Sequence, residues 1–595
     1  MKLSLLPIAA AVAVATSAYA EETTTLPEVV VSASRTEQTV DNALASVTVI
    51  SREEIARNPA LDIGDLLSSY GGVNVVRSGG PGQQTSIFLR GAASTQVLVL
   101  VDGARIGTSS LGQPNIQFLR PDNIERIEIV RGPKSSLYGS EAIGGVINII
   151  TRKSSTPATT ISVTGGGQGT FGGSLRQDSQ SGKFSSAVAV STFYTDGYPL
   201  LETVSEDSGY RNTGLLAQLG YGDSTLGANA NYQQNSGRNE YLASFTLSPT
   251  SQDFFNDFTS LDVHGKFFEI WNSKLMYSMS REKNEQNGSS DYLHTEREQI
   301  DWQNDFALPG NNLVTAGATY YTNHVDTVSF GSGYDITLNT TAFYLQDQFT
   351  LGAFSALLAG RHESSSEYGN NSTGEATLGW SFSENYRAYA TYSTGFKAPT
   401  AGDLYAPGFS NPDLKPEEAV NKEIGFKGQA GAWNFGLAAF RNDVDELINY
   451  NGMMPVNIDE ARLSGGEFRL ALRQGNLKWT NEYAYVKAED RKTGDELSRR
   501  PRSSLSSQLD YSLDRYNVGG QIIARSDSDN SAYDNVEVPG WGVGNLYVGM
   551  EVSKQVSLTL NVQNIADKTY GTAYTGNQPY IAQPRLVTLT ADIKL

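Results

Sequence analysis

The chain has 595 residues, of which 39% are hydrophobic, 10% aromatic and 18% charged. Beyond the first twenty residues, no stretch has the roughly 20 consecutive apolar residues of a membrane-spanning helix, and the aromatic content is too high for a disordered chain. The formal net charge of -19 argues against a nucleic-acid partner, because polyanions bind basic surfaces. These numbers leave a soluble multidomain protein or a β-barrel.

Residues 1–20 have the pattern of a secretory signal peptide. Lys2 precedes the apolar run 3–14, and Ala18-Tyr19-Ala20 supplies the small residues of a cleavage site. We therefore predict that the mature chain begins at Glu21. The sequence contains no cysteine, so the exported protein relies on neither disulfides nor thiolate metal sites.

Residues 21–33 form a short segment ahead of the first domain. Pro27 disfavours a helix, and the three valines at 29–31 favour an extended strand. A short exposed strand can add to the edge of a partner's sheet. The alternative is that this segment is simply the first strand of the domain that follows.

Residues 34–152 predict a compact mixed α/β domain. Ser51 and Glu54 have the spacing of a helix capping box. Ile63, Leu66, Leu67 and Tyr70 share one face of a predicted helix that stops before two glycines. Short β-rich runs follow, and they predict strands at 97–101, 126–131 and 146–150.

Residues 153–595 consist of alternating apolar and polar positions broken by turn residues, as at 556–563, 587–595 and the predicted hairpin 378–392. A large soluble β-sandwich or propeller would alternate in the same way. Strands of about 10 residues, aromatic residues near their ends and turns that are short on one side favour a membrane barrel. Divided evenly over residues 153–595, 22 strands would leave about 20 residues for each strand with its connection, and 16 strands would leave about 28.

Several segments resemble a known family in order along the chain. Glu28, Val29, Val30, Val31, Ser32 and Ala33 resemble the Ton box of TonB-dependent outer-membrane transporters. Residues 86–91, 97–105 and 131–151 resemble the signatures of that family's plug domain, and residues 396–399, 411–417, 440–444 and 564–570 resemble segments of its barrel. The resemblance covers nearly the whole mature chain.

The resemblance implies a mostly β fold, a 22-stranded antiparallel transmembrane β-barrel with an N-terminal α/β plug inside its lumen. The expected divisions are a signal peptide at 1–20, the Ton box segment at 21–33, the plug at 34–152 and the barrel at 153–595. The expected location is the bacterial outer membrane, where lipid and lipopolysaccharide surround a monomeric barrel. The expected protein partner is TonB with its inner-membrane energising complex.

Within the family, the chain resembles the transporters of cobalamin (vitamin B12) in length and in residues 79–86, which are similar to a substrate loop on their plug. A second substrate loop is expected at 106–112. Amide and hydroxyl groups suit a bulky, largely neutral ligand, although a plain Gly-rich turn explains each residue equally well. The residues expected to bind the ligand are Gln83, Gln84, Thr85, Ser86, Gly107, Thr108, Ser109, Ser110 and Leu111.

Cobalamin transporters of the enteric type also carry aspartates that bind calcium in early barrel loops. The corresponding stretch here has only Glu202, Glu206 and Asp207. Ca²⁺ takes six to eight oxygen ligands, so the resemblance implies a weakened calcium site and no required cofactor.

Three other functions compete with cobalamin import. A ferric-siderophore receptor is the main alternative. Haem receptors also resemble this chain around residues 396–399 and 411–414, but they carry an iron-binding histidine between these segments. A haem receptor is disfavoured because this chain has no histidine between residues 396 and 414. An outer-membrane barrel hydrolase is the remote alternative, since no catalytic constellation stands out and an enzyme needs no plug. The G-x-G-x-x-G at 167–172 is expected to form a hairpin, because no helix follows it.

Overall fold

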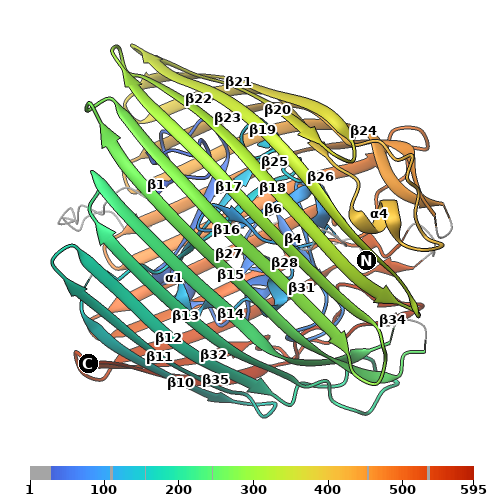
Figure 1. Cartoon of the computed structure of the whole chain (residues 1–595). Coiled ribbons are helices and arrows are strands. Elements are labelled where there is room, and N and C mark those ends of the chain that lie inside the picture. Colours follow the sequence, from blue (N-terminus) through green and yellow to red (C-terminus); the bar gives the residue numbers. More distant parts are fainter. Residues whose placement is uncertain (1–28, 108–111, 155, 244–245, 452–453, 532–535) are drawn as a thin grey trace.

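A computed structural model describes the chain except residues 1–28, 108–111, 155, 244–245, 452–453 and 532–535. Twenty-two antiparallel strands form a closed barrel, in which the first strand, β10, pairs with the last, β35. The N-terminal elements lie inside this ring, as Figure 1 shows in blue. The predicted 22-stranded barrel with an internal plug is confirmed. Among the described residues, no helix is long and apolar enough to span a bilayer.

The barrel strands follow one another in chain order, and each pairs with the next. Their bounds are β10 (Ala158–Gly166), β11 (Phe171–Ser181), β12 (Phe184–Thr195), β13 (Tyr210–Gly222), β14 (Leu226–Leu242), β15 (Pro249–Phe267), β16 (Trp271–Gln286), β17 (Tyr292–Leu308), β18 (Asn312–Ser329), β19 (Ser332–Leu351), β20 (Phe354–Ser365), β21 (Gly369–Ser383), β22 (Tyr386–Lys397), β23 (Glu417–Ala430), β24 (Trp433–Asn451), β25 (Met454–Gln474), β26 (Leu477–Asp490), β27 (Ser503–Leu513), β28 (Tyr516–Arg525), β31 (Trp541–Glu551), β32 (Val556–Gln563) and β35 (Leu586–Lys594).

The predicted strand length of about 10 residues is wrong for much of the barrel. The strands range from 8 residues in β32 to 21 in β25. About 10 tilted residues suffice to cross the apolar layer, but neighbouring strands continue to satisfy each other's backbone groups beyond it.

The connections between strands differ at the two ends of the barrel. At one end, here called the turn end, they are two to four residues long, as at 182–183, 268–270 and 384–385. At the other end, the loop end, they include the long segments 196–209, 398–416, 491–502, 526–540 and 564–585. The loop-end segments carry α4 (Ala401–Tyr405), β29 (Ser528–Asp529), β30 (Glu537–Val538), β33 (Tyr574–Thr575) and β34 (Gln578–Pro579). The hairpins predicted at 378–392 and 167–172 are both present.

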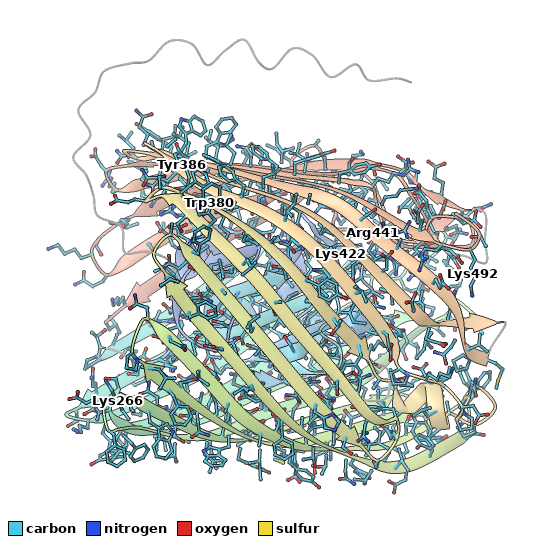
Figure 2. The ribbon with its side chains drawn as sticks, turned by 90° about the horizontal axis from the view of Figure 1, so that it is seen from above. Lys266, Trp380, Tyr386, Lys422, Arg441 and Lys492 are labelled. Atoms are coloured by element: carbon cyan, nitrogen blue, oxygen red, sulfur yellow. The ribbon has the colours of Figure 1, made fainter. Side chains whose placement is uncertain are left out.

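The outer wall of the barrel carries an apolar belt. Leu219, Ile424 and Leu437 are each more than half exposed, which a water-surrounded sheet rarely tolerates in such numbers. Figure 2 labels Trp380, Tyr386 and Lys266 toward one end of the wall, and Arg441 and Lys492 toward the other. This distribution is that of a barrel surrounded by lipid, with aromatic and charged groups near the interfaces.

The plug is built around a five-stranded sheet in the order β3-β8-β9-β6-β7, in which only β6 and β9 pair in parallel. Its elements are β1 (Val29–Val30), β2 (Gln38–Thr39), β3 (Val47–Ser51), α1 (Arg52–Arg57), α2 (Ile63–Ser68), β4 (Val73–Arg77), β5 (Thr85–Leu89), β6 (Val97–Val101), β7 (Ala104–Arg105), β8 (Ile124–Arg131), α3 (Ser135–Tyr138) and β9 (Gly145–Thr151), with 3₁₀ turns at Ser94–Gln96, Ile116–Phe118 and Pro121–Asn123.

Local sequence signals account for the plug's elements. The predicted capping box is present: the Ser51 side chain accepts from the Glu54 amide, and the Glu54 carboxylate accepts from the Ser51 amide. The predicted helix face of Ile63, Leu66 and Leu67 is fully buried in the same core as the sheet. The sheet and helices therefore share one core, which Phe258 of β15 and Met276 of β16 extend to the barrel wall.

Candidate functional site

Ion pairs join the plug to one side of the barrel wall. The Arg90 guanidinium lies 2.6 Å from Glu423 of β23 and 2.7 Å from Glu467 of β25, and Arg131 shares Glu467 at 3.2 Å. Lys134 pairs with Glu375 of β21 at 2.7 Å. Burial by itself lowers the pKa of Arg90, but the nearby carboxylates of Glu423 and Glu467 raise it by a larger amount. The pKa of Arg90 therefore lies above its usual value, and the side chain keeps its charge.

The segment that resembles a Ton box is folded against the plug near the turn end. Val29–Val30 pairs with Gln38–Thr39, and Val30, Ser32 and Ala33 are 0%, 0% and 3% exposed. Of the two alternatives drawn from the sequence, this conformation has the segment paired within the plug rather than exposed, because the plug itself supplies partners for its backbone. Glu28 lies outside the described residues.

A buried carboxylate holds the segment in place. Oε2 of Glu128, on β8, accepts hydrogen bonds from the Val31 amide at 3.0 Å, the Ser32 amide at 2.9 Å and the Ser32 hydroxyl at 2.6 Å. Asn148 donates to the Ser32 hydroxyl at 3.0 Å, and the Tyr138 hydroxyl donates to the Ser32 carbonyl at 3.3 Å. We call these contacts around Val31 and Ser32 the latch. Charge-assisted bonds of this kind are about twice as strong as neutral ones.

The next residues tie the same segment to the barrel wall. Arg35 pairs with Asp301 of β17 at 3.1 Å and donates to the Tyr344 hydroxyl at 2.9 Å, with its guanidinium over the rings of Tyr138 and Tyr344. Gln346 of β19 donates to the Ser34 carbonyl at 2.9 Å. Burial lowers the pKa of Arg35, but Asp301 and the two tyrosines raise it above its usual value, so the ion pair persists.

The first predicted ligand loop, residues 79–86, lies at the loop end and packs closely against the barrel. Gly82 has a φ of +76°, and a side chain there would collide with the ring of Tyr210. Gly80 faces Tyr198 with room for no more than a tight Cβ contact, 3.1 Å from the ring. The glycines are therefore required by the approach of barrel tyrosines to the plug backbone.

The predicted ligand residues fall into different environments. Gln83 is buried and donates to the Glu240 carbonyl at 2.5 Å, and Thr85 is buried and donates to the Gln83 carbonyl at 2.8 Å. Gln84 is exposed, and half-buried Ser86 donates to Gln113 at 3.2 Å. Gly107 is half-buried, whereas Thr108, Ser109, Ser110 and Leu111 lie outside the described residues. Gln83 and Thr85 thus hold the loop's shape, and Gln84 and Ser86 are the side chains of this loop with exposed surface.

The connections at the loop end carry a net negative charge. They contain 15 acidic and 8 basic residues, a formal charge of -7, and none of the four histidines. Five of the basic residues lie in the single connection 491–502. This count covers residues 167–170, 196–209, 243–248, 287–291, 330–331, 366–368, 398–416, 452–453, 491–502, 526–540 and 564–585. The connections at this end therefore have a charge that disfavours anions, and none of them carries an imidazole.

The residues of the expected calcium site do not fit a bound Ca²⁺. Glu202, Glu206 and Asp207 are exposed, and the Ser205 hydroxyl donates to Glu206 at 3.4 Å. Within the described parts of the chain, no three acidic or imidazole side chains converge on a point where a metal would sit. The transport mechanism proposed below uses no calcium.

Two family models match the chain. The model described as "TonB-dependent Receptor Plug Domain" matches residues 39–146, and the model described as "TonB dependent receptor-like, beta-barrel" matches residues 154–565. The chain belongs to the TonB-dependent receptor family. It is therefore a TonB-dependent transporter of the Gram-negative outer membrane, and the members of this family are not enzymes. By the family's architecture, the loop end is extracellular and the turn end periplasmic.

Individual relatives share the fold, but their names refer to different ligands. A vitamin B12 transporter BtuB from Photobacterium profundum is 29% identical over 617 residues, covering all of both chains. The siderophore receptor PiuA from Acinetobacter baumannii superposes with a TM-score of 0.78 at 18% identity, covering 94% of this chain and 98% of PiuA. The ferric yersiniabactin uptake receptor FyuA from Yersinia pestis gives 0.79 at 17% identity, covering 93% and 98%. The two solved structures support the fold alone.

Sequence reasoning missed the groups that hold the plug and the latch. Glu128 lies in the strand 126–131, where Ile127 and Ile129 face the core and a carboxylate on the opposite face had no visible partner. The pairs Arg35 with Asp301 and Arg90 with Glu423 join residues more than 260 positions apart. The one available signal was a charged residue inside an apolar strand, which indicates a buried partner.

Proposed function

We propose that this protein imports cobalamin across the outer membrane, using TonB and the energy of the inner membrane. The observation that carries the choice of ligand is the acidic, histidine-free set of loop-end connections described above, with its formal charge of -7. Ferric siderophores are mostly anionic chelates, which such a charge disfavours, whereas a bulky ligand rich in amides is insensitive to it. The full-length similarity to a vitamin B12 transporter supports the same ligand.

The ligand is proposed to bind between the plug loop 79–86 and the extracellular connections. Gln84 and Ser86 offer amide and hydroxyl groups, and the glycines at 79, 80 and 82 let the barrel tyrosines Tyr198 and Tyr210 pack beside the loop. Such a site combines aromatic contact with a few polar groups. A ferric siderophore remains the second candidate, because the solved relatives include receptors for such ligands.

Binding outside must then affect the latch at the periplasmic end. A ligand shifts only equilibria between states to which it binds differently. We propose that the ligand-bound state disfavours the contacts of Val31 and Ser32 with Glu128, and that the released residues 28–33 pair as a strand with TonB. Because TonB needs the backbone groups that the latch occupies, the latch and TonB compete for the same segment.

A titration tests the choice of ligand. Purified mature protein is titrated with cobalamin, a ferric catecholate siderophore and haem by isothermal calorimetry, with and without a calcium chelator. We expect submicromolar binding of cobalamin alone, unchanged by the chelator. Binding of the siderophore and not of cobalamin would replace the proposed ligand and leave the family assignment intact.

A further inference from the structure

The plug's ion pairs to the wall are confined to one arc of the barrel. They reach β17 through Asp301, β21 through Glu375, β23 through Glu423, β25 through Glu467 and β26 through Lys478. Within the described chain, no ion pair within 4.0 Å joins the plug to β10–β16 or to the strands from β27 to β35. Among the described residues, the ion pairs between the plug and the wall therefore lie along β17–β26 only.

The opposite wall holds the plug through hydrogen bonds rather than ion pairs. Its charged side chains take part as well: Arg176 of β11 donates to the Asn123 side chain at 3.3 Å, and Arg525 of β28 donates to the Ser68 carbonyl at 2.8 Å. Asn212 of β13 donates to the Phe118 carbonyl at 2.8 Å, and Gln218 donates to the Thr151 hydroxyl at 2.9 Å. Asn231 of β14 donates to Asp102 at 3.1 Å. A side-chain amide that leaves such a contact is readily solvated, whereas separating a buried ion pair leaves two uncompensated charges.

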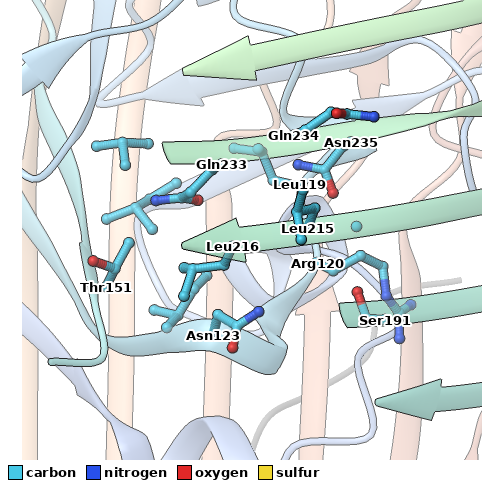
Figure 3. A pocket seen from close by; sticks show the side chains of 14 residues that line it. Leu119, Arg120, Asn123, Thr151, Ser191, Leu215, Leu216, Gln233, Gln234 and Asn235 are labelled. Carbon is cyan, nitrogen blue, oxygen red and sulfur yellow. The ribbon is translucent and has the colours of Figure 1, made fainter. Parts of the chain in front are cut away.

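A small, partly open pocket of about 40 Å³ lies between the plug and strands β12–β14. Figure 3 shows its lining, with Thr151 and Asn123 from the plug and Ser191, Leu216 and Gln233 from β12–β14. The seam is also rich in buried polar atoms without a protein partner, namely Nε2 of Gln233, Oε1 of Gln218 and Oδ1 of Asn231. Buried amides are normally satisfied, so these atoms are suited to water or to a polar ligand.

We infer that the transported ligand passes between the plug and the wall of β12–β14, and that the charged arc β17–β26 acts as the fixed side from which the plug opens. This inference rests on the proposed transport function and adds to it the route. The pocket is lined by amide and hydroxyl groups together with Arg120 and apolar side chains such as Leu119 and Leu216, a mixture that suits a neutral ligand with both hydrogen-bonding and apolar groups. Opening the plug on this side exchanges its hydrogen bonds for bonds to water and breaks no ion pair between the described residues of the plug and β12–β14.

Cross-links across the two sides of the plug test the route. The pair Thr151→Cys and Gln218→Cys joins the plug to β13. The pair Ser135→Cys and Gly395→Cys joins the plug to β22. The Ser135 hydroxyl lies 3.3 Å from where a Cβ on Gly395 would be, and the Thr151 hydroxyl lies 2.9 Å from Nε2 of Gln218, so both pairs join residues in contact. Both pairs are joined with the same short, reducible dithiol reagent, and the extent of cross-linking is measured by mass spectrometry.

We expect the Thr151–Gln218 cross-link to lower cobalamin uptake at least tenfold, with recovery after reduction. The Ser135–Gly395 cross-link is expected to keep more than half of the uptake. An equal block by both cross-links would mean that the whole plug leaves the barrel, and the reverse pattern would place the route on the charged side. Either result overturns the inference.

A second measurement needs no ligand and so separates this inference from the proposed function. Hydrogen exchange of the purified protein is followed at increasing urea. Plug peptides that face β12–β14, residues 115–124, are expected to lose protection at lower urea than residues 131–144, which face β21–β25. The opposite order overturns the inference, whereas absence of cobalamin uptake by the unmodified protein would contradict only the proposed function.

Discussion

The latch makes a quantitative prediction about how tightly TonB binds in the absence of ligand. In Glu128→Gln the side chain keeps its size but loses its charge. Oε2 of Glu128 accepts three hydrogen bonds from Val31 and Ser32, and Glu128 also pairs with Arg126 at 2.8 Å. A hydrogen bond to a charged group contributes about 1 kcal/mol more than a neutral one, so we expect the latch to weaken by about 2 kcal/mol or more.

This loss should appear as tighter binding of TonB. The apparent Kd for a partner equals the intrinsic value divided by the fraction of protein with the segment free. A latch weaker by about 2 kcal/mol raises that fraction about 30-fold while the free form is rare, and the apparent Kd falls by the same factor. The measurement is fluorescence anisotropy of a labelled periplasmic TonB fragment titrated with the purified, ligand-free transporter.

Glu125→Gln is the matched control. Glu125 is an exposed glutamate on the same strand, three positions before Glu128, and it makes no contact with the latch. We expect the control to bind the TonB fragment like the unmodified protein, and we expect ligand to strengthen TonB binding less in Glu128→Gln than in the control. Equal affinity of the two variants without ligand would refute the assignment of Glu128 as the latch.

Four further changes have expected outcomes. Val30→Pro removes a backbone donor and should abolish uptake while ligand binding persists, whereas Val30→Ala should transport normally; both are measured with radiolabelled ligand. Gly82→Ala, at φ +76° and against Tyr210, should lower the thermal midpoint more than Gly408→Ala, at φ +77° in open space, and equal shifts would show that the contact is unimportant. Glu467→Gln leaves Arg90 and Arg131 short of a partner and should destabilise the plug by about 3 kcal/mol in urea unfolding followed by hydrogen exchange. Removing calcium with a chelator should leave the Kd for ligand unchanged, whereas a tenfold rise in that Kd would show that bound calcium supports ligand binding.

The fold was predictable because its signals are local. The alternation at 556–563 and the turn at 383–385 fix strands and a hairpin without reference to the rest of the chain. The capping box at Ser51 and the apolar face of Leu66 and Leu67 do the same for the plug helices. Strand length was not predictable, because pairing beyond the bilayer depends on the neighbouring strand rather than on apolar content.

The candidate site was less predictable because its contacts are not local. The sequence places Val30 and Ser32 in an extended segment, but only the fold brings Glu128 beneath them. In the same way, Gln83 has the chemistry of a ligand-binding residue, but the approach of β14 turns it to the Glu240 carbonyl. A side chain's chemistry can be read from the sequence, but its partner is decided by elements far away along the chain.

The most direct test of the account is uptake of radiolabelled cobalamin by a Gram-negative host that lacks its own cobalamin transporter and expresses this protein. The account predicts accumulation that requires TonB and the membrane potential and that disappears in Val30→Pro. Cobalamin accumulation without TonB, or no accumulation while a ferric siderophore is taken up, would contradict it.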